Sequence, residues 1–221
     1  MGTKGRVCTM ANVYQAAARF YDCLSGERTV YRAGRERGVA LLNLRPGAIV
    51  LDLGCGTGLN FALLVDAVGP SGTVIGLDRS PEMLTMARRR VLANGWTSVC
   101  LIEADATTFD PMRVANVLPA ASGGLVDGVF SSYAMSVFDD WHPAWERTRA
   151  LLRPEGRACI VDMQVPVGAA RVFRPLVRLA TAVGGADLDA HPWTVIERDG
   201  VNVQCASVRG GHIRIVAGTI L

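Results

Sequence analysis

The residues best suited to chemistry lie in and around a glycine-rich turn with the sequence VLDLGCGTG. Gly54, Gly56 and Gly58 follow an apolar run, and a glycine has no Cβ to keep a ligand away from the backbone. A helix that begins after such a turn directs its first N–H groups toward the same place. Asp52 in the run and Asp78, about 20 residues beyond the turn, add two carboxylates. The pattern predicts a site for a nucleotide-like ligand.

The spacing of the turn bears on which ligand that is. The dinucleotide fingerprint GxGxxG requires its third glycine at position 59, where this chain has Leu59 and places Gly58 one residue early. Asp78 ends the next apolar run, where a carboxylate can accept hydrogen bonds from both hydroxyls of a ribose. Arg79 beside it suits a 2′-phosphate, but Asp78 would repel one. The pattern therefore favours a nucleoside-containing ligand and weakens the case for a pyrophosphate.

Alternating apolar runs and helical patterns must position these residues. Buried strands are predicted at 48–53, 73–77, 98–102, 125–130 and 157–163, and the intervening helices at 59–68, 81–93 and from Pro143 to about 153. Residues 201–208 and 213–219 have the pattern of a hairpin. Helical spacing predicts three more helices at 13–24, 30–44 and 169–183.

This alternation predicts an α/β fold. Five strand and helix repeats indicate a Rossmann-like, doubly wound, mostly parallel sheet of seven strands, closed by a C-terminal antiparallel hairpin. Ligands of such sheets bind beyond the carboxyl ends of the strands. We expect one domain over 1–221, in which two N-terminal helices (1–45) lie over a ligand-binding core (46–163), followed by a helix and the closing hairpin (164–221).

Composition narrows the class of protein. The chain has 221 residues, 50% of them hydrophobic and 19% charged, which suits one globular core. No apolar run approaches the roughly 18 residues that span a bilayer, and no signal-peptide core follows the start, so we expect a cytoplasmic protein. The net charge of +3 gives no reason to expect a nucleic-acid partner. Six cysteines without a CxxC pair predict no metal site.

Five stretches taken together resemble the motifs of the class I S-adenosylmethionine (AdoMet)-dependent methyltransferases. In family order they are LDLGCGTG, GLDRSPEML, EADATTF, DGVFSSYAMSVFDDW and LLRPEGR, between residues 51 and 157. The resemblance implies an enzyme that transfers a methyl group from AdoMet to a small molecule. It also implies that the N-terminal helices act as a lid over the cofactor, with the YxxxAxxYD phrase (Tyr14 to Asp22) in the first of them.

The resemblance also implies a set of cofactor-binding residues, namely Tyr21, Asp52, Gly54, Cys55, Gly56, Gly58, Asn60, Asp78, Arg79, Met83, Asp105, Ala106 and Ser131. Asp52 and the turn would hold the methionine end, and Asp78 the ribose. Arg79 and Met83 would flank the adenosine, while Asp105 and the Ala106 N–H would meet the adenine. Core packing is the alternative for Met83, and a turn or cap is the alternative for Asp105. Tyr14 and Tyr21 share a helical face and could simply pack in the core.

Catalysis by such an enzyme needs alignment more than functional groups. AdoMet carries an activated methyl group, so the protein must align the nucleophile and exclude water. Ser131, Ser132 and Tyr133 would line the crevice near the methyl group, and Tyr133 is the preferred catalytic residue. Tyr14, Tyr21 and His212 are alternatives. His142 and His191 each precede a proline in predicted loops and are expected to be structural.

A weaker similarity concerns the acceptor. SSYAMSVFDDW, LLRPEGR and the later segment PWTVIE resemble bacterial N-methyltransferases of lipid head groups, which implies a small-molecule or lipid acceptor methylated at nitrogen. Quinone C-methyltransferases and natural-product methyltransferases, which act on carbon or oxygen, share the first half of the pattern. Arg171, Arg174 and Arg178 lie on one face of the expected 169–183 helix, where they would either contact a membrane peripherally or form a solvated stripe.

Three other classes of function stay open. An NAD(P)-dependent oxidoreductase would need GxGxxG and a catalytic set such as Tyr and Lys, and Lys4 is the only lysine. A non-catalytic AdoMet-binding module would carry the same cofactor motifs. A nucleic-acid methyltransferase fits less well, because the fourth motif lacks the (D/N)PP(Y/F) run of the enzymes that methylate amino groups of bases.

Overall fold

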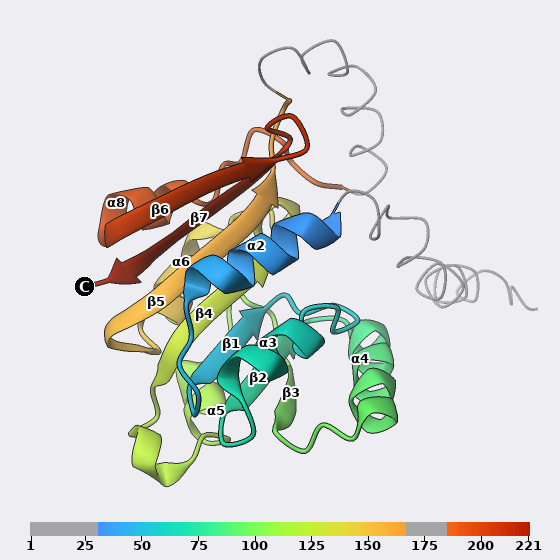
Figure 1. The fold of residues 1–221 in the computed structure, drawn as a ribbon. Coiled ribbons are helices and arrows are strands. Elements are labelled where there is room, and N and C mark those ends of the chain that lie inside the picture. Colours follow the sequence, from blue (N-terminus) through green and yellow to red (C-terminus); the bar gives the residue numbers. More distant parts are fainter. Residues whose placement is uncertain (1–30, 167–184) are drawn as a thin grey trace, which may run out of the picture.

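The computed structural model describes residues 31–166 and 185–221, and in these ranges seven strands form one sheet in the order β3-β2-β1-β4-β5-β7-β6 (Figure 1). The strands are β1 Ile49–Leu53, β2 Thr73–Asp78, β3 Val99–Glu103, β4 Val126–Ser132, β5 Leu152–Met163, β6 Gly200–Val208 and β7 Ile213–Ile220. Neighbours from β3 to β5 pair in parallel, whereas β7 is antiparallel to both β5 and β6. The predicted mostly parallel sheet with a C-terminal antiparallel hairpin is confirmed.

Helices cover both faces of this sheet. They are α2 Arg32–Leu42, α3 Phe61–Val68, α4 Pro81–Asn94, α5 Pro111–Ala115, α6 His142–Arg149 and α8 Thr194–Asp199, with short 3-10 turns at Ala120–Ser122 and Met135–Val137. One apolar core joins the sheet to α2, α3 and α4, and a second joins it to α5, α6 and α8. In Figure 1, α2 lies in front of β5. Two cores on opposite faces make the fold doubly wound, as the sequence predicts.

The central strand β1 shows why this sequence forms such a sheet. All five of its residues, IVLDL, are buried, as expected of a parallel strand covered on both faces. Leu51 and Leu53 face one core, and Val50 faces the other. Only Asp52 breaks the apolar run, so this carboxylate is carried into the middle of the fold.

Two boundaries predicted from sequence are wrong. Helix α6 ends at Arg149 instead of near residue 153, and β5 begins at Leu152 instead of 157. Leu152 pairs with Val126 on β4, and the next pairs follow a register shift that leaves Pro154 and Glu155 outside the regular ladder. A proline is tolerated in a strand at such a bulge, and Glu155 adopts a positive φ of 62°. Pro154 therefore lies at a bulge within β5 and does not mark the end of a helix.

Two short helices were not predicted. Helix α5 follows Asp110, whose side chain accepts a hydrogen bond from the Met112 N–H and caps the first turn. Helix α8 lies directly before β6, and its Val195 and Ile196 enter the core. His142 also differs from expectation, because it is the first residue of α6 and not part of a loop. Helices of five or six residues are too short for apolar periodicity to reveal.

Several expectations fall outside the described residues. The helices predicted at 13–24 and 169–183, with Tyr14, Tyr21 and the three arginines at 171, 174 and 178, belong to this group. The helix predicted at 30–44 is confirmed as α2. Within 31–166 and 185–221, no helix is both long enough and apolar enough to span a bilayer.

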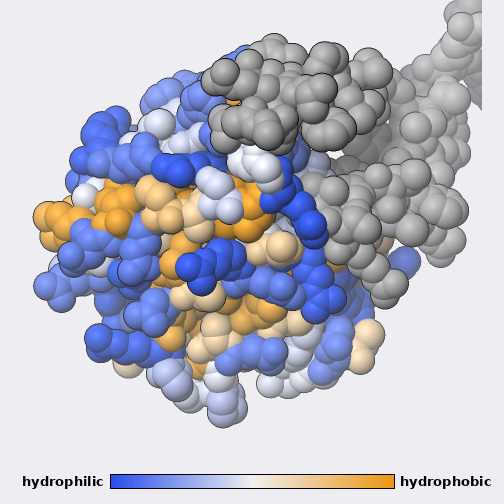
Figure 2. Space-filling view, turned by 45° about the horizontal axis from the view of Figure 1, so that its top comes forward, coloured by the Kyte–Doolittle hydropathy of each residue, from blue (hydrophilic) through white to orange (hydrophobic). Residues whose placement is uncertain are grey.

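The surface fits this division of apolar residues into two cores. On the face shown in Figure 2, hydrophilic residues cover much of the described surface, with apolar residues in bands between them. The large apolar side chains that are exposed in the described part are Leu92, Met112, Val117, Val137, Val201 and Leu221. Isolated exposed apolar residues of this kind are ordinary for a folded domain.

Candidate functional site

The glycine turn and Asp78 meet at the carboxyl edge of the sheet. The turn leaves the end of β1, and the N–H groups of Gly54 and Cys55 both donate to the Leu77 carbonyl, at 2.8 and 3.0 Å. The Gly56 N–H donates to Oδ2 of Asp78 at 2.8 Å, and Oδ1 of Asp78 accepts from the Ser80 N–H at 2.9 Å. A hydrogen bond therefore joins the glycine turn to Asp78, the two features of the sequence that most strongly indicate a ligand site.

The three glycines of the turn serve two different purposes. All three have a positive φ, of 70° at Gly54, 54° at Gly56 and 78° at Gly58. A Cβ on Gly54 would lie 2.4 Å from Cβ of Ala134, and one on Gly58 would lie 2.5 Å from the Phe61 ring. A Cβ on Gly56 would meet nothing within 4 Å. Gly54 and Gly58 thus allow the chain to pack, whereas Gly56 leaves open space above the turn.

Cys55, between these glycines, presents its backbone to the site and its side chain to the core. The residue is 5% exposed, and a Cβ on Gly76 of β2 would lie 2.9 Å from its Sγ. Burial raises the pKa of this thiol. If Cys55 contributes to ligand binding, it therefore does so through its backbone.

Asp52 and Asn60 form a buried polar pair behind the turn. Both are buried, and the side-chain amide of Asn60 donates to Oδ1 and Oδ2 of Asp52 at 2.8 and 3.1 Å. Asn60 is the N-cap residue of α3, but its side chain makes no cap bond because it is directed to Asp52. The side-chain oxygen of Asn60, Oδ1, accepts from the Ser132 hydroxyl at 3.1 Å. The pair thereby links the ends of β1, β4 and α3.

The environment of Asp52 changes its acidity. Desolvation by burial raises the pKa of this carboxyl to about 7, against the lowering effects of the Asn60 hydrogen bond and of the Arg35 charge, while nearby Asp78 adds to the rise. Arg35 lies on α2, on the face of the sheet that α2 shares with α3 and α4. Its positive charge near Asp52 is a feature of the site that the sequence patterns did not reveal, because only the packing of α2 brings the two residues together.

Asp105 closes the site at the end of β3. Its Oδ1 accepts from the Thr107 N–H at 2.8 Å and from the Thr107 hydroxyl at 2.6 Å. These two bonds, followed by the smaller effect of the Arg79 charge, lower the pKa of Asp105. The Asp105 carbonyl accepts from the N–H groups of Thr108 and Phe109, so residues 105–109 form a tight turn. Asp105 is a turn residue, and its binding role stays a prediction.

The remaining residues expected around an adenosine surround the same edge. Arg79 is exposed and Ala106 is 5% exposed. Met83 lies in the first turn of α4, where its N–H donates to the Ser80 hydroxyl at 3.1 Å. Met83 is half-buried and belongs to neither core, and its contact with an adenine stays a prediction.

Tyr133 follows β4 directly and has an unusual conformation. Its φ is 55°, and its hydroxyl donates to the Tyr31 carbonyl at 2.8 Å. The rings of Tyr31 and Tyr133 meet edge to face at 4.7 Å, and the Arg35 guanidinium lies 5.0 Å from the Tyr133 ring centre. A Cβ on Gly34 would lie 2.1 Å from the Tyr133 hydroxyl, so only glycine allows this approach. The hydroxyl is thus directed at the start of α2, and its catalytic role stays a prediction.

Ser131 is buried and structural in its contacts, since its hydroxyl donates to the Leu53 carbonyl at 3.1 Å. His212, an alternative catalytic residue, is 8% exposed and its Nδ1 lies 2.8 Å from the Gln164 carbonyl. That bond ties the start of β7 to the residue after β5.

Asp162 is a further buried carboxylate that sequence reasoning missed. It is fully buried in β5 and accepts from the Ser136 hydroxyl at 2.6 Å, from the Ser136 N–H at 3.0 Å and from the Met163 N–H at 2.8 Å. Burial raises its pKa to about 6, against the effect of these bonds. The Ser136 carbonyl also accepts a hydrogen bond from the Asp187 N–H, at 2.8 Å. Asp162 therefore fixes the loop beyond β4 and, through it, residue 187.

The donor and acceptor chemistry of this edge fits AdoMet. Three carboxylates, Asp52, Asp78 and Asp105, lie on or directly after adjacent strands and offer acceptors. The ammonium, ribose hydroxyls and adenine amino group of AdoMet are all donors, whereas the pyrophosphate of NAD would face like charges. The open space above Gly56 provides room for a ligand against the turn. A mainly acidic edge is thus suited to a cationic nucleoside.

The comparisons with known proteins agree with this reading. Residues 50–156 match a family model described as "Methyltransferase domain". Over 124 residues the chain is 34% identical to the arsenite methyltransferase of Halobacterium salinarum, covering 56% of this chain and 29% of that protein. It is 28% identical over 169 residues to the demethylmenaquinone methyltransferase of Symbiobacterium thermophilum, covering 72% and 64%. The chain thus spans less than two thirds of either relative.

A solved structure shows the same fold over nearly the whole chain. A SAM-dependent methyltransferase from Aquifex aeolicus superposes with a TM-score of 0.63 and 18% identity, over 94% of this chain and 98% of that one. The superposition therefore extends well beyond residues 50–156, the part of the chain that the family model matches.

Proposed function

We propose that the chain is a class I AdoMet-dependent methyltransferase and that it transfers the methyl group of AdoMet to a small-molecule acceptor, as the match of residues 50–156 to the methyltransferase family model supports. The observation that carries the proposal is the bond from the Gly56 N–H to the Asp78 carboxylate. It joins the glycine turn to the acid expected to bind a ribose, at the edge of the sheet where doubly wound folds bind ligands.

In this proposal each acidic residue recognises one part of the cofactor. Asp78 accepts hydrogen bonds from the ribose hydroxyls, and Asp105 accepts one from the adenine amino group. Asp52, held by Asn60, attracts the ammonium of the methionine end. When bound, AdoMet supplies a methyl group that its positively charged sulfur has already activated. The protein aligns the acceptor with that group and excludes water, and an amine acceptor must reach it without its proton.

The acceptor side is assigned to the ends of β4 and β5. Tyr133, Ser136 and Asp162 lie there. The loop after β4 is held by two buried hydrogen bonds from Ser136 to Asp162 and by a part-buried bond from the Tyr133 hydroxyl to the Tyr31 carbonyl. A rigid loop of this kind can fix the position of a small acceptor. Arg35 contributes a positive charge that lowers the pKa of Asp52.

Two acceptor chemistries are candidates. A nitrogen acceptor, in an amine or a lipid head group, follows from the resemblance of the motifs beyond β4. A quinone carbon is favoured by the similarity to the demethylmenaquinone methyltransferase, which extends over 72% of this chain. The arsenite methyltransferase is also named for a small acceptor. Both candidates share the cofactor site, so the choice between them lies with the residues around the acceptor.

Turnover tests the proposal. Purified protein is incubated with AdoMet and a panel of ethanolamine-type amines and reduced naphthoquinones, and S-adenosylhomocysteine (SAH) formation is measured. We expect the wild type to form SAH with at least one acceptor, and we expect Asp78→Ala to form none. SAH bound tightly by the protein, but formed with no acceptor, would favour a non-catalytic AdoMet-binding module instead.

A further inference from the structure

Helix α6 contributes a side chain to the turn after β3. Arg147 donates from its Nε to the Thr107 carbonyl at 2.9 Å and from a terminal nitrogen, Nη1, to the Phe109 carbonyl at 2.8 Å. The guanidinium fork thus occupies two carbonyl oxygens of one turn, 38 and 40 residues away in sequence. Arg147 is half-buried, so part of this contact is shielded from water.

Thr107 connects Arg147 to Asp105. Its N–H and its hydroxyl both donate to Oδ1 of Asp105, at 2.8 and 2.6 Å, while its carbonyl accepts from Arg147. The Phe109 N–H donates to the Asp105 carbonyl at 2.8 Å, and the Phe109 carbonyl accepts from Arg147. Both residues held by the guanidinium are therefore bonded directly to Asp105.

Packing behind the turn is consistent with this arrangement. Phe109 is 4% exposed and belongs to the same apolar core as Trp145, which precedes Arg147 on α6. The core fixes the distance between α6 and the turn, but apolar contacts leave the orientation of a five-residue turn weakly specified. Two directional hydrogen bonds from one rigid group can specify it.

We propose that Arg147 is a positioning residue for adenine recognition: it holds the 105–109 turn so that the Asp105 carboxylate and the Ala106 N–H face the adenine of AdoMet. This inference rests on the proposed function. Arg147 does not contact the cofactor in this account, and its effect passes through Thr107 and Phe109. A second prediction follows, namely that Arg147 governs selectivity for the base more than binding of the remainder of the cofactor.

The test compares two ligands that differ only in the base. SAH carries adenine, whereas S-inosylhomocysteine carries an oxygen where adenine has its amino group. A site that accepts a hydrogen bond from that amino group discriminates against the analogue. Calorimetric titration of both ligands gives the selectivity ratio for the wild type, Arg147→Met and Arg147→Lys. Lysine keeps the charge but cannot donate in the same planar fork.

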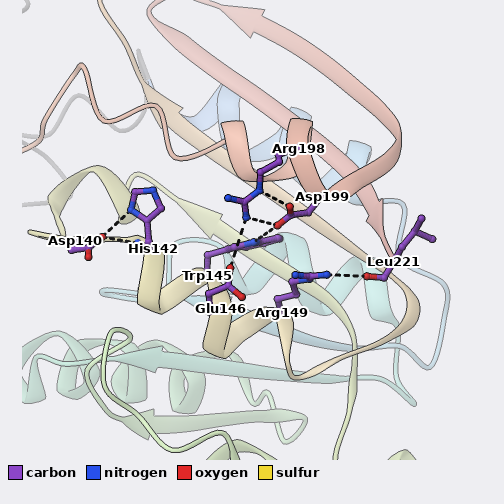
Figure 3. A network of polar contacts seen from close by, with 8 residues as sticks. All are labelled: Asp140, His142, Trp145, Glu146, Arg149, Arg198, Asp199 and Leu221. Atoms are coloured by element: carbon purple, nitrogen blue, oxygen red, sulfur yellow. Dashed lines mark hydrogen bonds and ion pairs between the residues drawn. The ribbon is translucent and has the colours of Figure 1, made fainter.

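Arg149 supplies a matched control on the same helix. Its guanidinium donates to the Leu221 carbonyl at 3.4 Å, on the side of α6 where Trp145 and Asp199 lie (Figure 3). Arg149→Met removes an identical side chain two residues along. Thermal unfolding of every variant shows whether the helix and sheet are intact.

The expected result is a loss of selectivity that is specific to Arg147. In Arg147→Met, SAH should bind about tenfold more weakly, and the ratio of SAH affinity to S-inosylhomocysteine affinity should shrink toward one. The ratio for Arg147→Lys should lie between those of the wild type and Arg147→Met. Arg149→Met should keep the wild-type ratio. Unchanged selectivity in a folded Arg147→Met, or an equal weakening of both ligands, would overturn the inference. If the wild type binds neither ligand, the proposed function itself fails.

Discussion

Asp52 and Asn60 form a buried carboxylate–amide pair, in which one amide nitrogen donates to both carboxylate oxygens, at 2.8 and 3.1 Å. Asn60→Leu would leave Asp52 buried without this donor. We expect the free energy of unfolding to fall by about 1–3 kcal/mol, because a buried acceptor loses its partner, and SAH to bind more weakly. Urea denaturation and calorimetric titration measure the two effects. Wild-type stability in Asn60→Leu would show that the pair is not needed.

The pKa of Asp52, about 7, predicts how ligand binding depends on pH. The carboxyl is neutral in the folded protein below that pH and attracts the ligand's ammonium only when ionised. SAH affinity should therefore rise as pH increases from about 6 to about 8, by up to about tenfold. Titration calorimetry at several pH values measures the rise. The same rise in Asp52→Asn would mean that another group is responsible.

The two raised carboxyl pKa values also predict the pH dependence of stability. Asp162 and Asp52 stay protonated in the folded protein up to about pH 6 and about pH 7, whereas an unfolded aspartate ionises near pH 4. Between these limits the folded state holds more protons, so the free energy of unfolding should fall as pH rises from about 4 to about 7. A flat profile from denaturation at matched ionic strength would contradict these shifts.

Ser136 stabilises the ionised form of Asp162 through its hydroxyl and its N–H. Ser136→Ala should lower the free energy of unfolding by about 1–3 kcal/mol at about pH 7.5, and by less near pH 5, where Asp162 is protonated. Denaturant titration at the two pH values measures the difference. Ser207→Ala, at an exposed position on β6, is the control and should change stability little at either pH. An equal loss in both variants would contradict the role of the Ser136 hydroxyl.

Two glycines of the turn should respond differently to the same substitution. In Gly54→Ala the new Cβ would lie 2.4 Å from Cβ of Ala134, so we expect a loss of about 2 kcal/mol or more in stability. In Gly56→Ala the new Cβ meets nothing within 4 Å, so stability should fall by only about 1 kcal/mol, from its positive φ. SAH binding should nevertheless be lost in Gly56→Ala, because the methyl group occupies the open space above the turn. Undiminished binding would place the ligand elsewhere.

Most of the fold was predictable because its signals are local. Each buried strand contains a short, mainly apolar run. Ser80, Pro81 and Gly95 mark the ends of α4 through a cap bond, a first-turn proline and a left-handed C-cap. The bulge in β5 was missed because, in the sequence alone, Pro154 has the pattern of a residue that ends a helix. Only the pairing of Leu152 with Val126 shows that the strand has already begun.

The positions of some candidate site residues were predictable, although their roles stay predictions. The turn, Asp52, Asp78 and Asp105 adjoin strands in sequence, so the sheet alone places them at one edge. Arg35, Arg147 and Asp162 act through contacts between distant segments, such as the 40 residues that separate Arg147 from Thr107. No periodicity or spacing encodes such a contact, which depends on how α2 and α6 pack on the sheet.

The central claim is that the glycine turn and Asp78 bind AdoMet, and calorimetric titration of the wild type and Asp78→Ala with SAH tests it most directly. Glu103→Gln, at the β3 position paired with Asp78, is the matched control. We expect micromolar binding of SAH to the wild type and to Glu103→Gln, loss of SAH binding in Asp78→Ala, and no binding of NADH to any of them. Binding of NADH without SAH, or SAH binding that survives in Asp78→Ala, would contradict it.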